Sequence, residues 1–425
     1  MLTRRSFLSS CAMAPGMLLG GRLLQAGAAL ADDVADAPHV SSKALAIHKR
    51  ALVFDGHVHA LDREFYQGGS IGTRKQDGYW DLPRALEGGV GAFFCSVYIP
   101  EEYYPSRFET KQALRRVEHA LEQLELNRDV VQLALNADDI TRIRAKGKIA
   151  AVLDIEGSYD LDGDLGVLHD LYRLGVRSAQ LSAHNWSQSY ADACCSPAQW
   201  SGLTPHGHEV VREMNRLGMV INVSHASDDT ISQAIDVSTD PLCATHHGLR
   251  SVVNIPRNMP DALLKKMASK GGVFGFQVGN EFHSPQEYAY QTQHAKHSFW
   301  DTSTVRKEVE GKSIYEVDKL VGPQFPRVGP VVPDDVKMTP DEWVAVVDKA
   351  IGMVGEDHVS FGSDFDGGPN LPRGMRDTRD LPMITDAMVR CGYSEARIDK
   401  FWGGNLLHLF RQVTQSPEGQ RTQIR

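Results

Sequence analysis

Two histidines one residue apart are the first side chains along this chain that could do chemistry. His57 and His59 stand in "ALVFDGHVHAL", residues 51–61, at the end of a short apolar run. A His-x-His of this kind is either a pair of metal ligands or two polar residues where a strand meets a loop. Taken alone, the spacing favours the second interpretation, so the rest of the sequence has to decide between them.

Further histidines and acids stand in the same relation to other apolar runs. In chain order they are Glu156, His184, His225, His246 with His247, and Asp364 with Asp366. Imidazole nitrogens and carboxylate oxygens are a suitable ligand set for Zn²⁺ or a similar divalent ion. A carboxylate such as Glu156 can bridge two ions, with one oxygen on each. Each residue alone has an ordinary structural explanation, but five such run ends together favour a metal-dependent hydrolase.

Some of the candidates keep a structural interpretation. His247, beside His246, is expected to be a helper or a surface residue. His206 and His208, on the first turn of a predicted helix, are expected to be solvated. Asp366 is expected to hold its own loop by accepting hydrogen bonds from backbone amides.

The apolar runs predict the elements that position these side chains. They cover residues 51–59, 89–99, 149–157, 176–185, 218–227, 240–248, 271–279 and 358–368. Nearly continuous apolar runs are typical of parallel strands that are covered on both faces.

The segments between the runs have helical patterns. Residues 204–218 and 339–355 both begin with a Thr-Pro cap signal, and the second adds a capping box. Residues 110–127 and 394–410 are predicted to form two more amphipathic helices. Eight strands alternating with helices predict an α/β fold, a (β/α)8 TIM barrel in one domain. A doubly wound open sheet is the alternative, although no Gly-rich phosphate motif follows the first strand.

The barrel prediction explains why the candidate residues come at strand ends. In a parallel barrel these ends meet at one rim, where active sites lie. Residues 281–335 interrupt the alternation between strands seven and eight and are rich in aromatic residues and prolines. This insert is expected to lie over the catalytic rim, as a lid or as a subunit contact in a homodimer.

The N-terminus is interpreted as a removable signal peptide. Residues 1–31 contain "LTRRSFLSS", then a weakly apolar stretch, and end in Ala29-Leu30-Ala31. This order is typical of a secretory signal, and the paired arginines indicate the bacterial twin-arginine export machinery. The expected location is therefore periplasmic or secreted, and a disordered cytosolic extension is the alternative. The catalytic domain is predicted over residues 32–412, followed by a polar tail at 413–425.

Charge and hydropathy exclude some partners. The net charge is −9, and it becomes −12 when the first 31 residues are left out, because they carry three arginines and no acid. So acidic a surface repels nucleic acid phosphates and anionic lipids. No stretch after the leader is apolar for long enough to span a bilayer, and the polar tail excludes a tail anchor. Five cysteines follow the leader, an odd number, so at least one thiol is expected to be free.

Five motifs in order resemble those of a known family. "DGHVH", "DIEG", "GLTPHGHEVVREMNRLGMVINVSHAS", "ATHHGLRSVVNIPRNMPD" and "HVSFGSDFDGG" are similar to successive motifs of the membrane (renal) dipeptidase family, peptidase family M19. The likeness extends from about residue 45 to residue 410. Members are binuclear zinc peptidases with an amidohydrolase-type barrel. The resemblance implies the same fold, two zinc ions and hydrolysis of dipeptides, including some with a C-terminal D-residue.

The resemblance also implies roles for individual residues. The implied metal ligands are His57, His59, Glu156, His225, His246 and Asp364. Glu156 would bridge the two ions, and a hydroxide that also bridges them would attack the peptide bond. Asp364 would transfer the proton to the leaving amine. His184 would steady the carbonyl as it becomes tetrahedral, and Arg257 would bind the free carboxylate of the substrate.

The chain departs from the family pattern at two places. The family usually has His-x-Asp where this chain has His57-x-His59, and it often has an aromatic residue near Gly279. A neutral imidazole in place of a carboxylate raises the net charge of the site. Three functions therefore stay open: a zinc dipeptidase, a family member that matures a secreted peptide natural product such as a siderophore, and a metal-free binding or scaffold protein.

Overall fold

The computed structural model describes residues 40–104, 108–157, 159–161, 163–294 and 305–415. The predicted signal peptide, residues 1–31, and most of the polar tail lie outside these ranges. Among the described residues, no helix combines the length and the apolar character needed to cross a membrane.

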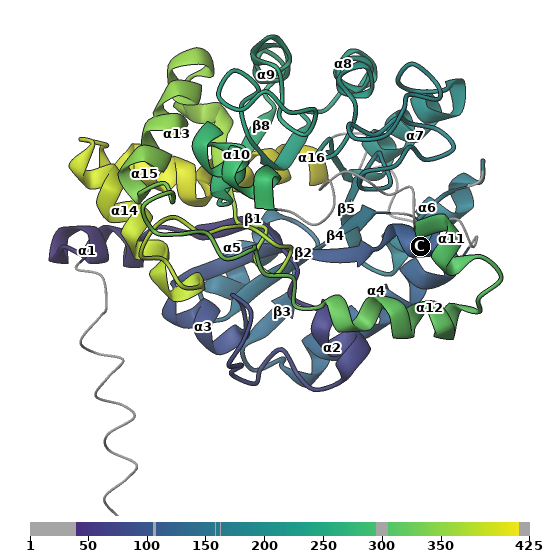
Figure 1. The fold of residues 1–425 in the computed structure, drawn as a ribbon, viewed down its shortest axis with the longest axis horizontal. Helices are drawn as coiled ribbons and strands as arrows, with labels where there is room; N and C mark the ends of the chain where they lie inside the picture. Colours follow the sequence, from purple (N-terminus) through teal and green to yellow (C-terminus); the bar gives the residue numbers. More distant parts are fainter. Residues whose placement is uncertain (1–39, 105–107, 158, 162, 295–304, 416–425) are drawn as a thin grey trace, which may run out of the picture. The chain divides into compact units, whose positions relative to one another are not determined.

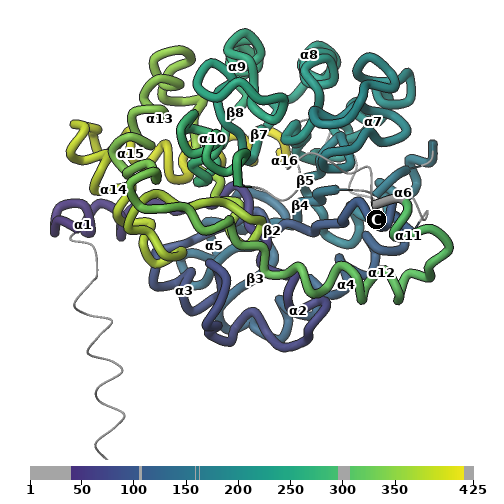
Figure 2. Tube along the Cα trace, viewed as in Figure 1, coloured from purple at the N-terminus to yellow at the C-terminus, as the bar shows by residue number. Residues whose placement is uncertain are grey.

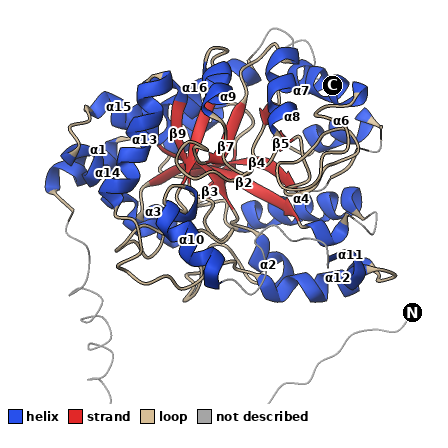
Figure 3. Ribbon diagram, turned by 45° about the horizontal axis from the view of Figure 1, so that its top comes forward, coloured by secondary structure: helices blue, strands red, loops and turns tan. Residues whose placement is uncertain are grey.

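All eight predicted strands are present and run parallel (Figures 1 and 3). They are β1 Val53–Val58, β2 Val90–Ile99, β4 Ile149–Gly157, β5 Val176–Gln180, β6 Val220–Asn222, β7 Cys243–His247, β8 Val273–Gln277 and β9 Val359–Gly362. A short strand that was not predicted, β3 (Val131–Leu133), pairs with β4 outside this series. The strands are buried along almost their whole length, as continuous apolar runs predict.

The last strand returns to the first, so the sheet is a nearly closed barrel. The amide of His59 donates to the carbonyl of Phe365 at 3.0 Å, and the amide of Asp364 donates to the carbonyl of His57 at 2.9 Å. Both bonds lie just beyond the end of β9. The (β/α)8 prediction is therefore confirmed, and the open doubly wound sheet is excluded.

Helices surround the strands in Figure 3. The α-helices are α1 Ser42–Arg50, α2 Asp62–Gln67, α3 Leu82–Glu87, α4 Glu109–Leu126, α5 Ala137–Arg144, α6 Leu165–Arg173, α7 Pro205–Leu217, α8 Asp228–Val237, α9 Asp261–Ala268, α10 Pro285–His294, α11 Val305–Val309, α12 Ile314–Val321, α13 Pro340–Val354, α14 Leu381–Arg390, α15 Glu395–Asp399 and α16 Asn405–Thr414. The 3₁₀ turns are η1 Glu101–Tyr103, η2 Asn280–Phe282, η3 Gly322–Gln324, η4 Glu356–His358 and η5 Thr378–Asp380.

The predicted helix caps are formed. Thr204 accepts a hydrogen bond from the Gly207 amide at the start of α7, and Thr339 and Glu342 form the capping box of α13. The helix predicted over 394–410 is instead divided into α15 and α16 by a π turn, η6 Lys400–Gly404. Gly403 packs so close to β1 that a Cβ there would lie 2.3 Å from the carbonyl oxygen of Leu52. The backbone of this turn can approach β1 so closely because residue 403 is a glycine and has no side chain.

Helix α16 closes the amino end of the barrel. It contacts β1, β6, β8 and β9. Leu406, Leu409 and Phe410 join a core cluster with Phe54 and Phe94 from the first two strands. With this end filled by apolar side chains, the carboxyl ends of the strands remain for chemistry.

The insert between β8 and β9 contains η2, α10, α11, α12 and η3. η3 packs against α2, while α11 and α12 pack against η1, so the insert reaches the loops that follow β1 and β2 (Figures 1 and 2). The last part of the insert is hydrogen-bonded to the segment after β9: the amide of Arg327, in the insert, donates to the carbonyl of Asp366 at 3.0 Å.

The described cysteines include three free thiols, Cys95, Cys243 and Cys391. Cys194 and Cys195 are joined by a disulfide. The expected free thiol is therefore present, and two of the three, Cys95 and Cys243, are buried.

Candidate metal centre

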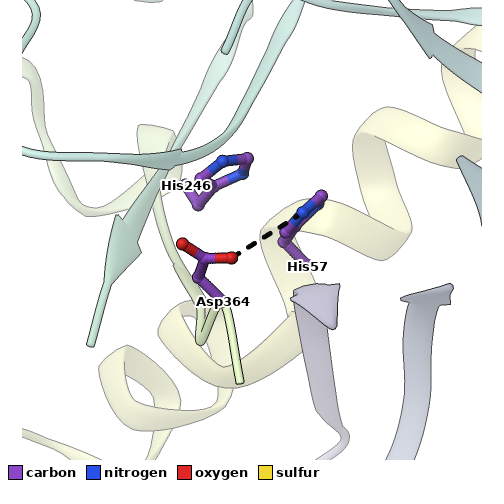
Figure 4. A group of neighbouring side chains, drawn as sticks. All are labelled: His57, His246 and Asp364. Carbon is purple, nitrogen blue, oxygen red and sulfur yellow. Dashed lines mark ion pairs between the residues drawn. The ribbon is translucent and has the colours of Figure 1, made fainter. Parts of the chain in front are cut away.

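Six predicted ligands converge at the carboxyl end of the barrel. His57 lies in β1, Glu156 in β4 and His246 in β7, while His59, Asp364 and His225 follow the ends of β1, β9 and β6 by one, two and three residues. All are buried except Asp364, whose side chain is 13% exposed. Figure 4 shows three of them, His57, His246 and Asp364, pointing toward one another from separate elements.

The Glu156 carboxylate lies at the centre of this cluster. Its Oε2 atom is 2.7 Å from His57 Nε2 and 3.2 Å from His59 Nε2. Its Oε1 atom is 3.3 Å from His225 Nε2 and 3.7 Å from His246 Nε2. Each oxygen thus faces its own pair of imidazoles, which divides the cluster into two halves.

Asp364 belongs to the half that contains His57 and His59. Its Oδ1 atom is 3.2 Å from His59 Nε2 and 4.0 Å from His57 Nε2. Gln277, at the end of β8, donates its amide hydrogen to Oδ2 of the same carboxylate. One oxygen of Asp364 is therefore held by the protein, and the other faces the cluster.

The donor atoms fit divalent cations. The Nε2 atoms of His57 and His59 are 3.4 Å apart, and those of His225 and His246 are 3.0 Å apart. At such distances two ring nitrogens repel each other, whether both carry protons or both present bare lone pairs. Several sets of three donors lie within 4.8 Å of one another, among them His57, His59 and Glu156. Nitrogen and oxygen donors so arranged suit Zn²⁺ or a related ion.

Electrostatics distinguishes the two halves. Burial in itself raises the pKa of Glu156, but the charges of His57 and His59 bring that pKa well below its usual range. Burial in itself lowers the pKa of His57, but the carboxylates of Glu156 and Asp154 together outweigh it and raise the pKa to about 9. For His225 and His246, burial lowers the pKa well below the usual range and the Arg257 charge adds to the effect. These two imidazoles are neutral at physiological pH, which is the form that binds metal.

Other side chains fix the orientation of the donors. Thr245 Oγ1 lies 2.9 Å from His246 Nδ1, and Asn185 Oδ1 lies 3.2 Å from His225 Nδ1. Ser96 donates to Glu156 Oε2 at 2.9 Å. With Nδ1 engaged, the Nε2 lone pairs of the two histidines are directed into the cluster.

The backbone is unusual at the same rim. Four residues other than glycine at this rim have a left-handed backbone, with φ values of 57° at His184, 65° at His225, 60° at Asp364 and 63° at Asp366. Such conformations cost about 1–3 kcal/mol each and persist where the surrounding structure imposes them, often at functional sites.

His184 lies beside the cluster and is held by a residue that the sequence analysis missed. Glu101 Oε1 bonds His184 Nδ1 and accepts from the Asn185 amide at 3.2 Å. Burial in itself raises the pKa of Glu101, but the charge and hydrogen bond of His184, with Arg327, bring that pKa to about 2. Its position just beyond the second apolar run is the same strand-end signal that identified the other candidates.

A cavity of about 640 Å³ opens beside the cluster, and His184, His225, Arg257 and Asp364 line it. Arg257 is 1% exposed; its Nη2 donates to the His246 carbonyl at 2.8 Å, and its Nη1 has no hydrogen-bond partner among the described residues. Burial lowers the pKa of Arg257 to about 10, so the guanidinium stays charged at neutral pH. A buried cation with a free donor at a cavity wall is suited to an anionic group of a ligand.

The insert supplies part of the cavity wall. Gln324, Arg327 and Val328 line it, together with Phe282 from the turn after β8. The sequence predicts that the insert covers this rim, but it does not predict which residues face the cavity. Phe282 places an aromatic ring in the cavity wall three residues beyond Gly279, the position near which the family often has an aromatic residue.

The remaining candidates lie outside the cluster. His247 is buried, so the expectation of a surface residue is wrong; its ring packs on Phe274, with centroids 5.9 Å apart. Asp366 accepts from the amide of Tyr79, which lies in the segment between β1 and β2. It therefore bonds a backbone amide as expected, but one of a different loop from its own. His206 and His208 lie on the first turn of α7 and are half-buried, so they are less solvated than expected. His206 pairs with Glu209, three residues later.

Comparisons with known proteins agree on one family. The sequence model of "Membrane dipeptidase (Peptidase family M19)" matches residues 41–423. "Dipeptidase tcpJ" of Claviceps purpurea is 28% identical over 82% of this chain and 72% of its own length. "Dipeptidase 3" of Mus musculus is 28% identical over 90% of this chain and 68% of its own length.

Solved structures show the same fold. The probable dipeptidase PvdM from Pseudomonas aeruginosa is 24% identical, with a TM-score of 0.71 over 87% of this chain and 97% of that one. A metallo peptidase from Rhodobacter sphaeroides, liganded with a phosphinate mimic of L-Ala-D-Ala, is also 24% identical. Its TM-score is 0.65 over 85% of this chain and 99% of that one.

Proposed function

The chain belongs to the membrane dipeptidase family, peptidase family M19, and we propose that it hydrolyses dipeptides with two zinc ions held around Glu156. One observation carries this proposal: the two oxygens of Glu156 each face a separate pair of imidazoles. His57, His59 and Asp364 would hold one ion, and His225 and His246 would hold the other, with Glu156 shared. Such ions would activate a water molecule near neutral pH and polarise the scissile carbonyl.

Asp364 is the proposed general base and acid. It lines the cavity and is the most exposed carboxylate of the cluster. Gln277 holds one oxygen, which leaves the other to accept a proton from the attacking water and deliver it to the leaving amine.

His184 is proposed to stabilise the carbonyl oxygen of the substrate as negative charge develops on it. It lines the cavity, and Glu101 occupies its Nδ1. The ring can therefore donate from Nε2 to an oxyanion, while the Glu101 carboxylate keeps the imidazole oriented.

Arg257 is proposed to bind the free C-terminal carboxylate of the substrate. Two observations support this role: the guanidinium is buried, and its Nη1 has no hydrogen-bond partner among the described residues. A substrate carboxylate would neutralise this charge and accept a hydrogen bond from Nη1. A clamp so close to the metal cluster restricts substrates to those with the free carboxylate near the scissile bond. Dipeptides that end in a D-residue are included in the proposal, by analogy with the structurally similar metallo peptidase that is liganded with a phosphinate mimic of L-Ala-D-Ala.

The substrate proposal is tested by comparing dipeptides with their C-terminal amides. In the wild-type protein with zinc bound, kcat/KM should be higher for the free acids of an L,L and L,D panel. Arg257→Gln should lower kcat/KM for the free acids by about 100-fold, the effect of truncating one partner of a buried charge pair, and change it little for the amides.

Arg411→Gln is the matched control, because Arg411 lies on α16 at the closed end of the barrel. It should leave both substrate classes unaffected. If Arg257→Gln lowers kcat/KM equally for the free acids and the amides, Arg257 does not bind the substrate carboxylate.

The maturation of a secreted peptide natural product remains a second candidate function. The insert lines the cavity with Gln324, Arg327 and Val328, and this wall could accommodate a larger peptide. Wild-type protein that binds zinc but cleaves no dipeptide in the panel would favour this candidate. For either function we propose export by the twin-arginine route to the periplasm, on the basis of residues 1–31.

A further inference from the structure

We propose that Asp62 is a positioning residue that makes His59 a metal ligand, and that Arg116 in turn holds Asp62. The inference rests on the proposed function, because it concerns the same metal site. It concerns the position at which the chain departs from the motif that it otherwise resembles.

The two ring nitrogens of His59 face opposite partners. Nε2 lies 3.2 Å from Glu156 Oε2 and 3.2 Å from Asp364 Oδ1, inside the cluster. Nδ1 lies 2.7 Å from Asp62 Oδ2, on the outer side. A carboxylate accepts hydrogen bonds, so the ring proton belongs on Nδ1 and the lone pair of Nε2 is directed toward the metal site.

Asp62 is itself held in place. It is 1% exposed, and its Oδ1 atom forms an ion pair of 2.8 Å with Nη2 of Arg116 from α4. The Arg116 guanidinium is 2% exposed and lies over the rings of Phe65 and Tyr66, 4.5 Å and 4.9 Å from their centroids. The carboxylate therefore has one oxygen for the arginine and the other for the histidine.

A carboxylate at hydrogen-bond distance from Nδ1 distinguishes His59 from the other imidazoles of the cluster, since the buried carboxylate that faces Nδ1 of His57 is farther away. Nδ1 of His225 faces the amide oxygen of Asn185, and Nδ1 of His246 faces the hydroxyl of Thr245. Nδ1 of His57 is 3.6 Å from Asp154, too far for a hydrogen bond. Only His59 of these four has a carboxylate at hydrogen-bond distance on Nδ1.

The location of His59 explains why such support matters. The other histidine of the pair, His57, lies within β1, whereas His59 follows the strand. An imidazole beyond the strand needs a second contact to direct Nε2, and an Nδ1 carboxylate also increases the basicity of the ligating nitrogen. Burying an ion pair such as Asp62–Arg116 carries a desolvation cost, which is consistent with a role other than stability.

The test is a double-mutant cycle read out as zinc affinity, measured by competition with a chromophoric chelator. Asp62→Asn should weaken zinc binding by about 10- to 100-fold in the native background. In the His59→Asp background there is no Nδ1 to orient, so the same change should alter zinc affinity by no more than about twofold. Asp81→Asn is the matched control, because Asp81 is another buried aspartate paired with an arginine, Arg84, but contacts no histidine of the cluster.

Two results would overturn the inference. One is an equal loss of zinc affinity in both backgrounds, which would make Asp62 a support of the fold alone. The other is no loss in the native background. Both results are read from zinc affinity and require no peptide substrate. A wild-type protein that binds zinc but cleaves no dipeptide would contradict the proposed function, and the double-mutant cycle would still decide the role of Asp62.

A measurement on the wild-type protein covers the case in which Asp62→Asn does not fold. In the zinc-loaded protein, ¹⁵N NMR of the histidine rings should show a protonated Nδ1 for His59, assigned by its loss in His59→Asp. An unprotonated Nδ1 at His59 would contradict the inference without any change at Asp62.

Discussion

Glu156→Gln should reduce kcat/KM for dipeptides by about 10³-fold or more at saturating zinc, since metal-based stabilisation of several kcal/mol depends on this group. The carboxylate offers one oxygen to His57 and His59 and the other to His225 and His246. An amide of the same shape keeps one acceptor and presents an NH₂ group, which cannot bind a cation, to the other half. The measurement is kcat/KM on the dipeptide panel together with zinc content.

Glu118→Gln is a suitable control, because Glu118 is exposed on α4 and should leave activity unchanged. Thermal unfolding of both variants separates lost chemistry from lost structure. Near-wild-type activity of a folded Glu156→Gln protein would contradict a shared carboxylate at the centre of the site.

Asp364→Asn should have the second-largest effect, lowering kcat by about 10²- to 10⁴-fold, the usual contribution of general acid–base catalysis. An asparagine still fits the pocket and tolerates the left-handed backbone of this position, where φ is 60°. It cannot take a proton from water and pass it to the leaving amine. Because Glu156 and four histidines remain, zinc content should fall far less than kcat does.

The control for this variant lies two residues away. Asp366 has a similar φ of 63°, but it bonds the Tyr79 amide and does not line the cavity. Asp366→Asn should therefore retain most of the activity. A folded Asp364→Asn protein that keeps wild-type kcat would assign proton transfer to another group.

The sequence predicts the barrel and its rim well because both depend on local patterns. All eight apolar runs form strands, and the caps at Thr204 and Thr339 start helices. The break at Lys400–Gly404 was not predicted, since amphipathic periodicity continues through it. It reflects the close packing of Gly403 on β1, a tertiary contact that no local pattern contains.

The composition of the site is partly predictable and its geometry is not. The strand-end rule finds His57, Glu156, His246 and their neighbours, because parallel strands present these ends at one rim. It does not say which imidazole faces which oxygen of Glu156, since that depends on register around the closed barrel. Glu101 binds His184 across 83 positions of the chain, and nothing in the sequence near either residue pairs them.

Asp62 shows the same limit at short range. Asp62 follows His59 by three residues in "HVHALD" and is the first residue of α2, so the sequence shows that the two residues are close along the chain. That the carboxylate turns toward Nδ1 of His59 and is held by Arg116 depends on α4, more than fifty residues later. Such outer contacts decide how a ligand donates, and only the three-dimensional structure supplies them.

Elemental analysis of the purified wild-type protein, after gentle removal of unbound metal, tests the central claim most directly. The two halves around Glu156 predict two zinc ions per chain, and dipeptide hydrolysis that is lost when a chelator removes them. A chain that holds no divalent metal, or that keeps full dipeptidase activity with its metal removed, would contradict the binuclear site.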